Sequence, residues 1–148
     1  MHRRFATVGL LIAAISAIAP SVHSAEWKPP EEPESWQQVR QRLETKGTVE
    51  KSPWIFVGAL ETDTTRAAEY LSNPRGSDST TTFDALLLIK RSQSGEERSR
   101  EWTARPLTMR AICPEGRLER QGADGVWSAY PGRADTAAKV SWICQQTR

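Results

Sequence analysis

Two cysteines are the residues with the clearest chemical consequence in this 148-residue chain. Cys113 and Cys144 lie far apart and form no Cys-x-x-Cys motif, and there is no third cysteine to help complete a zinc site. In a protein that enters an oxidising compartment, such a pair favours a disulfide over two free thiols. We therefore predict a Cys113–Cys144 disulfide worth roughly 3 to 4 kcal/mol of stability.

Histidine is confined to the extreme N-terminal segment, where His2 and His23 are the only two in the chain. That segment is typical of a signal peptide, which is removed from the working protein. Without it the protein has no imidazole base, no Ser-His-Asp triad and no histidine metal ligand. We predict no catalytic residue, no metal site and no cofactor.

The N-terminal segment has the three parts of a signal peptide. Arg3 and Arg4 precede an apolar run over residues 5–19, which Pro20 ends. The run is shorter than the roughly 20 residues that a membrane-spanning helix needs, so we expect no permanent membrane span. Cleavage after residue 24 or 25 would release the chain to the periplasm, the cell surface or the medium.

The charge of the chain depends on this leader. The whole sequence has 20 Lys and Arg residues against 18 Asp and Glu, and loss of Arg3 and Arg4 leaves 18 against 18. A near-neutral protein gives no reason to expect a nucleic-acid or acidic-lipid partner.

Carboxylate pairs are the remaining route to catalysis, because two of them can hydrolyse glycosides without histidine. Glu96 with Glu97, and Asp124, are the candidates. Both positions fall in predicted turns, where acidic residues and glycine serve backbone geometry and solvation. We favour the structural interpretation.

Basic and aromatic residues form a candidate binding patch. In an extended strand Arg98, Arg100 and Trp102 would share one face, close to Arg105. Trp127 and Tyr130 complete the candidate patch, but they are three residues apart and would fall on opposite faces of a regular strand. A solvated face with one buried indole is the interpretation that we favour. Six tryptophans suggest recognition, although small exported sheets also use tryptophan to fill a thin core.

The segments that must position these residues begin with a Pro- and Glu-rich tether over residues 26–34. A helix is predicted over residues 36–46, with Ser35 as its N-cap, Gln38 completing a capping box and Trp36 docked on the core. A second helix is predicted over residues 136–145, capped by Asp135. Its expected buried stripe is Ala137, Val140, Ser141 and Cys144.

Strand patterns fill the region between the two helices. The predicted strands cover residues 54–60, 66–71, 83–90, 98–104, 108–113, 118–121 and 126–130. The first is apolar nearly throughout, which predicts a central strand covered on both faces. Residues 73–82 have the composition of a mobile loop, and residues 92–96 that of a turn.

Together these patterns predict one α+β domain over residues 35–148. Its antiparallel sheet of five or six strands would carry an N-terminal and a C-terminal helix packed on it, with one disulfide.

Trp54, the Val57-Gly58 pair, the Tyr70-to-Pro74 segment and the two late cysteines resemble small exported bacterial proteins of the surface-adhesin E type. The resemblance covers residues 54–144. Asn73 stands where that family usually has aspartate, and an extra Ser- and Thr-rich loop follows. The resemblance implies an antiparallel sheet, a C-terminal helix pinned by the disulfide, and binding of host proteins.

Three functions fit these observations. The first is a non-catalytic binding or adhesion module of the bacterial envelope, with a protein or polysaccharide ligand. The second is a periplasmic inhibitor or accessory subunit of an envelope enzyme, presenting residues 77–82 to its partner. The third is a small hydrolase that depends on Glu97 and Asp124. We predict a binder and not an enzyme.

Overall fold

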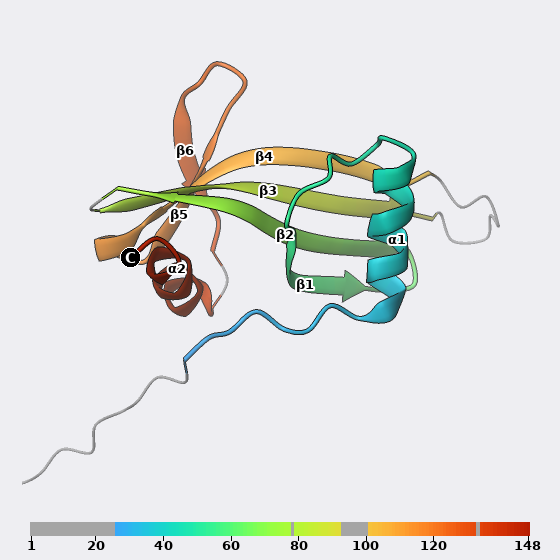
Figure 1. Ribbon diagram of the computed structural model, residues 1–148, viewed down its shortest axis with the longest axis horizontal. Coiled ribbons are helices and arrows are strands. Elements are labelled where there is room, and N and C mark those ends of the chain that lie inside the picture. Colours follow the sequence, from blue (N-terminus) through green and yellow to red (C-terminus); the bar gives the residue numbers. More distant parts are fainter. Residues whose placement is uncertain (1–25, 78, 93–100, 133) are drawn as a thin grey trace, which may run out of the picture.

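The computed structural model describes residues 26–77, 79–92, 101–132 and 134–148. The strands of these residues form a single antiparallel sheet whose order, β1-β2-β3-β4-β5-β6, follows the chain (Figure 1). This confirms the predicted α+β fold with a helix from each end of the domain. The elements are α1 (Glu34–Thr45), β1 (Ile55–Glu61), β2 (Thr65–Gly76), β3 (Thr80–Arg91), β4 (Thr103–Ile112), the 3-10 turn η1 (Cys113–Glu115), β5 (Arg117–Gln121), β6 (Trp127–Tyr130) and α2 (Thr136–Gln145).

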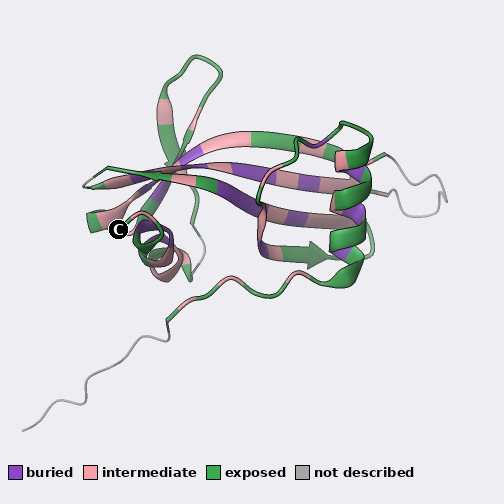
Figure 2. Ribbon diagram, viewed as in Figure 1, coloured by how far each residue is buried: buried purple, intermediate pink, exposed green. Residues whose placement is uncertain are grey.

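The central strands β2 and β3 hold many buried residues, which are purple in Figure 2. Tyr70 and Leu88 belong to a cluster with α1, whereas Leu71 and Phe83 belong to a cluster with α2. Since successive residues of a strand point to opposite faces, the two helices lie on opposite sides of the sheet. The fold therefore has three layers.

Helix α1 buries one stripe, made of Trp36, Val39 and Leu43. Trp36 is 2% exposed, which confirms that its indole fills the core. The predicted Ser35 cap is wrong. The helix begins at Glu34, because the carbonyl of Pro33 accepts the first backbone N–H groups, and no side chain caps it.

The segment before α1, residues 26–33, forms no helix or strand but contacts both helices. Trp27 meets Trp142 of α2 edge-on, with ring centroids 5.5 Å apart. Glu32 accepts hydrogen bonds from Arg40 of α1 at 2.9 and 3.0 Å, and Arg40 also pairs with Glu44 at 2.9 Å. The segment thus links the two helices past the β1 side of the sheet (Figure 1).

Strand β1 is an edge strand, so the predicted central position of residues 54–60 is wrong. The apolar run reflects the first part of the strand, residues 55–57, which is covered on both faces, and a bulge between Phe56 and Gly58 inserts Val57 as an extra residue. Phe56 and Val57 are both buried but belong to the clusters on opposite faces. Beyond the bulge the strand is exposed, and Leu60 is 50% accessible.

The predicted mobile loop over residues 73–82 is also wrong for the residues that the structure describes. Strand β2 continues to Gly76 and β3 starts at Thr80, with a hydrogen-bonded turn from Ser77 to Thr80. The register shifts between Ser72 and Arg75, where Asn73 has a φ of 52°. Asparagine tolerates this left-handed conformation, so the Asn-Pro pair forms a bulge within a strand.

Strand β4 is continuous where two strands, 98–104 and 108–113, were predicted. It pairs with β3 from Thr103 to Ile112, whereas β5 pairs only with its last part, from Met109. Pro106 therefore lies where the other edge of β4 has no partner in the described sheet. An edge tolerates the missing N–H of proline, which explains why Pro106 does not end the strand. Residues 98–100 and most of the predicted turn lie outside the described residues.

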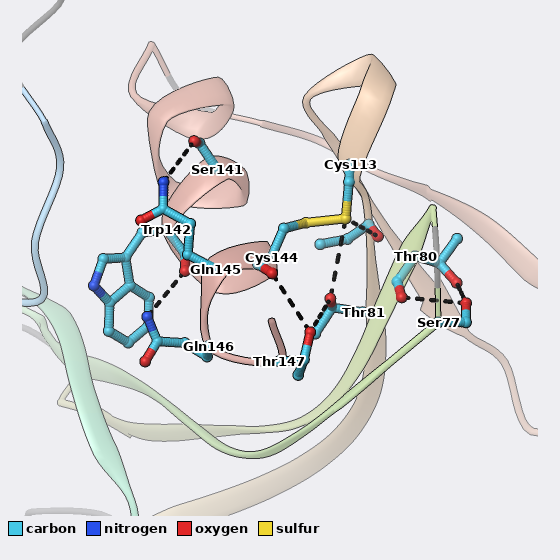
Figure 3. The surroundings of a disulfide bond; sticks show 11 residues. Ser77, Thr80, Thr81, Cys113, Ser141, Trp142, Cys144, Gln145, Gln146 and Thr147 are labelled. Carbon is cyan, nitrogen blue, oxygen red and sulfur yellow. Dashed lines mark hydrogen bonds between the residues drawn. A yellow bond between two sulfur atoms is a disulfide. The ribbon is translucent and has the colours of Figure 1, made fainter.

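The predicted disulfide is present between Cys113, directly after β4, and Cys144 of α2 (Figure 3). The two Cα atoms are 6.1 Å apart. Helix α2 covers the predicted residues 136–145, but its buried stripe is Val140, Ile143 and Cys144, and Ser141 is exposed. Asp135 occupies the N-cap position without a side-chain capping bond.

Next to the disulfide, the end of the β2–β3 hairpin contacts the C-terminal residues. The hydroxyls of Thr81 and Thr147 are 3.3 Å apart (Figure 3). A Cβ at Gly76 would overlap the Thr147 side chain, so only glycine allows this close approach. No helix in the described part of the chain is long and apolar enough to cross a membrane.

Loss of the disulfide should lower the free energy of unfolding by about 3 to 4 kcal/mol, because the link closes a loop of 31 residues in the unfolded chain. Urea unfolding of the oxidised protein and of the Cys113→Ser/Cys144→Ser double variant measures the difference. Reductant should destabilise the first protein and leave the second unchanged. Equal stability of the two proteins would contradict the prediction.

Arg40→Met should lower the free energy of unfolding by about 1 to 3 kcal/mol. The change keeps the alkyl stem but leaves the half-buried Glu32 and Glu44 without their cation. Urea unfolding measures the loss. Arg42→Met, at an exposed position of the same helix, is the matched control and should change stability by less than about 0.5 kcal/mol. Equal effects would show that the Arg40 ion pairs do not hold the segment before α1.

Candidate functional site

The residues of the candidate basic and aromatic patch lie in separate places. Trp102 packs edge-on against Trp36 of α1 at 5.5 Å, and Arg66 lies over both rings. Trp127 lies on β6, where Arg110 is 4.4 Å from its ring centroid. Tyr130 packs on the α2 side of the sheet. Arg98 and Arg100 lie outside the described residues. The opposite placement of Trp127 and Tyr130 agrees with their spacing.

The Arg110 that lies over Trp127 belongs to a network of ion pairs, in which the charged side chains pair with one another. Arg110 donates to both oxygens of Glu119, at 3.3 and 3.0 Å, and Arg117 donates to Glu119 and to Glu115. The hydrogen bonds from Arg110 outweigh desolvation and lower the pKa of Glu119. This carboxylate is therefore ionised at neutral pH and occupied by two arginines.

The acidic residues considered for catalysis do not form a site in the described part of the chain. Asp124 accepts the backbone N–H of Val126 at 3.0 Å, next to Gly125 with a φ of 80°. It therefore shapes the β5–β6 turn, as the structural interpretation predicts. Glu96 and Glu97 lie outside the described residues. No group of three or more potential metal ligands occurs within the described ranges.

A different feature has the form of a binding site: a groove of about 910 Å³ on the α1 side of the sheet. It lies between the α1–β1 connection, residues 46–54, and strands β3 and β4. Polar and apolar residues line it in about equal number: Glu44, Gly47, Thr48, Val49, Glu50, Lys51, Ser52, Trp54, Asn73, Asp84, Ala85, Leu86, Ala104, Pro106, Leu107 and Thr108.

The floor of the groove is apolar. Leu86 of β3 is paired with Pro106 of β4, and Ala104 is two residues along the same face. Trp54 and the buried Val49 line the side that the connection provides. The Trp54 indole N–H donates to the carbonyl of Glu50 at 2.9 Å, which fixes the ring within the connection.

One end of the groove is polar and held by hydrogen bonds. Asn73 donates to the Asp84 carboxylate at 2.9 Å and to the Ser52 hydroxyl at 3.1 Å. Arg75 donates to the other oxygen of Asp84 at 3.1 Å. The Ser52 and Ser72 hydroxyls are 2.6 Å apart. The side-chain amide of Asn73 on β2 therefore links β3 and the connection.

Asp84 is an acceptor and not an acid at neutral pH. Its partial burial raises its pKa, but the hydrogen bonds from Asn73 and Arg75, with the positive charge of Arg75, outweigh this and lower the pKa overall. Each oxygen already accepts one hydrogen bond and has a second lone pair for another donor. Its side chain is 38% exposed, so a ligand can reach it.

The ionised groups at the groove nearly balance one another. Glu44 shares Arg40 with Glu32, and Asp84 pairs with Arg75. Glu50 and Lys51, both exposed, are adjacent and of opposite charge. With these partners counted, the groove has an excess of one negative charge.

Sequence reasoning missed this site because its polar residues are far apart in the chain and one lies in a segment predicted as a loop. Asp84 offered a signal: it is the one charged residue within the apolar run from Phe83 to Ile89. A charged residue in such a strand indicates either a structural ion pair or a polar site.

Comparisons with protein-family models, curated proteins and solved structures found no match.

Asp84→Asn should lower stability at neutral pH and have a smaller effect in acid. The folded protein lowers the Asp84 pKa, so its charge stabilises the fold above the ordinary aspartate value of about 3.9, and this contribution is lost as the pH falls through the folded value. Urea unfolding at about pH 7 and about pH 2.5 measures this. Asp63→Asn, in the exposed β1–β2 turn, is the control. A pH-independent effect of Asp84→Asn would contradict the prediction.

Proposed function

We propose that this protein is an exported, non-catalytic binding module of the bacterial envelope, and that its ligand occupies the groove over β3 and β4. The observation that carries the proposal is the groove itself, in which an apolar floor meets a fixed polar end at Asp84. Ligand sites commonly combine apolar walls with a few polar groups that set orientation.

Two features support export. The N-terminal segment has the basic, apolar and small-residue parts of a signal peptide. The Cys113–Cys144 disulfide is typical of an oxidising compartment such as the periplasm or the exterior of the cell. The periplasm, the cell surface and the medium all agree with these features.

Binding fits the groove better than catalysis does. A general acid needs a pKa near the working pH, and that of Asp84 is shifted the other way. Its contacts with Asn73 and Arg75 also hold it in place, as a binding site requires. The resemblance to the surface-adhesin E type agrees with a binding role, and its implication of a host-protein partner stays a prediction.

Pro106→Arg should abolish ligand capture. Pro106 is exposed on the floor of the groove, at the free edge of β4, so the longer charged side chain fills the groove without displacing a buried residue. The purified protein, immobilised and exposed to solubilised envelope components of the source cell, measures capture. Binding at least about tenfold weaker is expected, since a buried charge without a partner opposes the ligand.

Thr103→Arg is the matched control, because Thr103 is exposed on the same strand and lies on the opposite face. It should leave capture unchanged. Urea unfolding shows whether both variants are folded. If Pro106→Arg is folded and captures the same components as the original protein, the groove is not the binding site.

A further inference from the structure

The charge balance of the groove selects the class of ligand. Asp84 pairs with Arg75, Glu44 shares Arg40 with Glu32, and Lys51 is the one cation among the lining residues. A polyanion would be repelled by the ionised carboxylates of the groove. A strongly basic peptide would find only one unpaired carboxylate among the lining groups, that of Glu50. The groove therefore disfavours a polyanion and offers a polycation little, so a ligand without net charge suits it best.

The floor and the polar end require a ligand with two kinds of surface. Leu86, Ala104 and Pro106 provide an apolar floor on the face of the sheet. At the end of that floor, each oxygen of the Asp84 carboxylate accepts one hydrogen bond and can accept another. A sugar ring has this combination, because its C–H groups form apolar faces and its hydroxyls, which donate hydrogen bonds, lie around its edge.

The free edge of β4 argues against an extended peptide. Peptides commonly bind to sheets by pairing their main chain with an exposed strand edge. The edge beside the groove carries Pro106, which has no N–H to donate, so the ladder would be interrupted in its middle. A ligand that binds through side groups does not need this edge.

We propose that the groove binds a neutral glycan segment, whose sugar rings lie on Ala104 and Pro106, above the buried Leu86, and whose hydroxyls donate to Asp84. This rests on the proposed function and adds the class of ligand. The glycan extends along β3 and β4 from Ala104 to the Asp84 end. The protein holds the glycan and breaks no bond in it.

The test is titration of the ¹⁵N-labelled protein with chitotetraose and cellotetraose, two neutral β-1,4-linked tetrasaccharides with and without acetamido groups. The backbone signals of Trp54, Asn73 and Asp84 and the indole N–H signal of Trp54 should shift with at least one of the two sugars. Pro106→Arg and Asp84→Asn should weaken that binding at least about tenfold, the loss expected for hydrogen bonds to a charged group. Thr103→Arg should bind as the original protein does.

Several results would overturn the glycan proposal. One is the absence of groove shifts with both sugars at millimolar concentration. Another is tighter binding of tetragalacturonate, an acidic tetrasaccharide of the same length, or of an envelope protein. If the neutral sugars fail while Pro106→Arg still abolishes capture of envelope components, the glycan is wrong and the groove remains the binding site. If Pro106→Arg leaves capture intact, the proposed function itself fails.

Discussion

Strands β2 and β3 bury side chains on both faces, and this requirement determines the layout of the molecule. A sheet buried on both sides needs a cover on each, and the two helices supply it from the two ends of the domain. After α1 has covered one face of the sheet, the chain must return to the edge strand β1. The connection over residues 46–54 makes that return on the α1 side of the sheet (Figure 1). The groove lies beside this connection, so the site is a by-product of the layered fold.

The periodic patterns predicted most of the elements, because they record burial directly. Leu86 to Ile89 predicted β3, and the stripe of Trp36, Val39 and Leu43 predicted α1. The cysteines predicted the link between β4 and α2, since no other partner was available to either. The strand and helix predictions succeeded because each depends on the residue types within one short segment. The disulfide prediction succeeded because two cysteines allow only one pairing.

The errors occurred at edge positions and at an inserted residue. Phe56 and Val57 are buried on opposite faces although β1 is an edge strand, so its first part resembles the apolar run of a central strand. The bulge at Asn73 places Asn-Pro within β2, and its composition is that of a turn. Pro106 looked like a break between strands because the sequence does not show which edge of β4 has a partner. Edge and bulge positions are tertiary properties, which local patterns do not encode.

The candidate site was less predictable for the same reason. Ser52, Asn73 and Asp84 meet only because the register of β2 with β3 and the path of the connection bring them together. The predicted aromatic patch failed to form because Trp102 packs on α1 whereas Trp127 lies over Arg110 on β6. Spacing along one strand showed correctly that Trp127 and Tyr130 take opposite faces, but it carried no information about positions on different strands.

The neighbours in the sheet follow the order of the chain, and the last element, α2, carries Cys144. A chain that emerges from its N-terminal end can therefore add each strand to the one before it, without waiting for a distant partner. The covalent link is the exception, because Cys113 has no partner until α2 has emerged. A chain that lacks α2 leaves Cys113 as a free thiol, whereas a chain that carries α2 can pair it. The disulfide thus distinguishes molecules that have folded through α2 from those that have not.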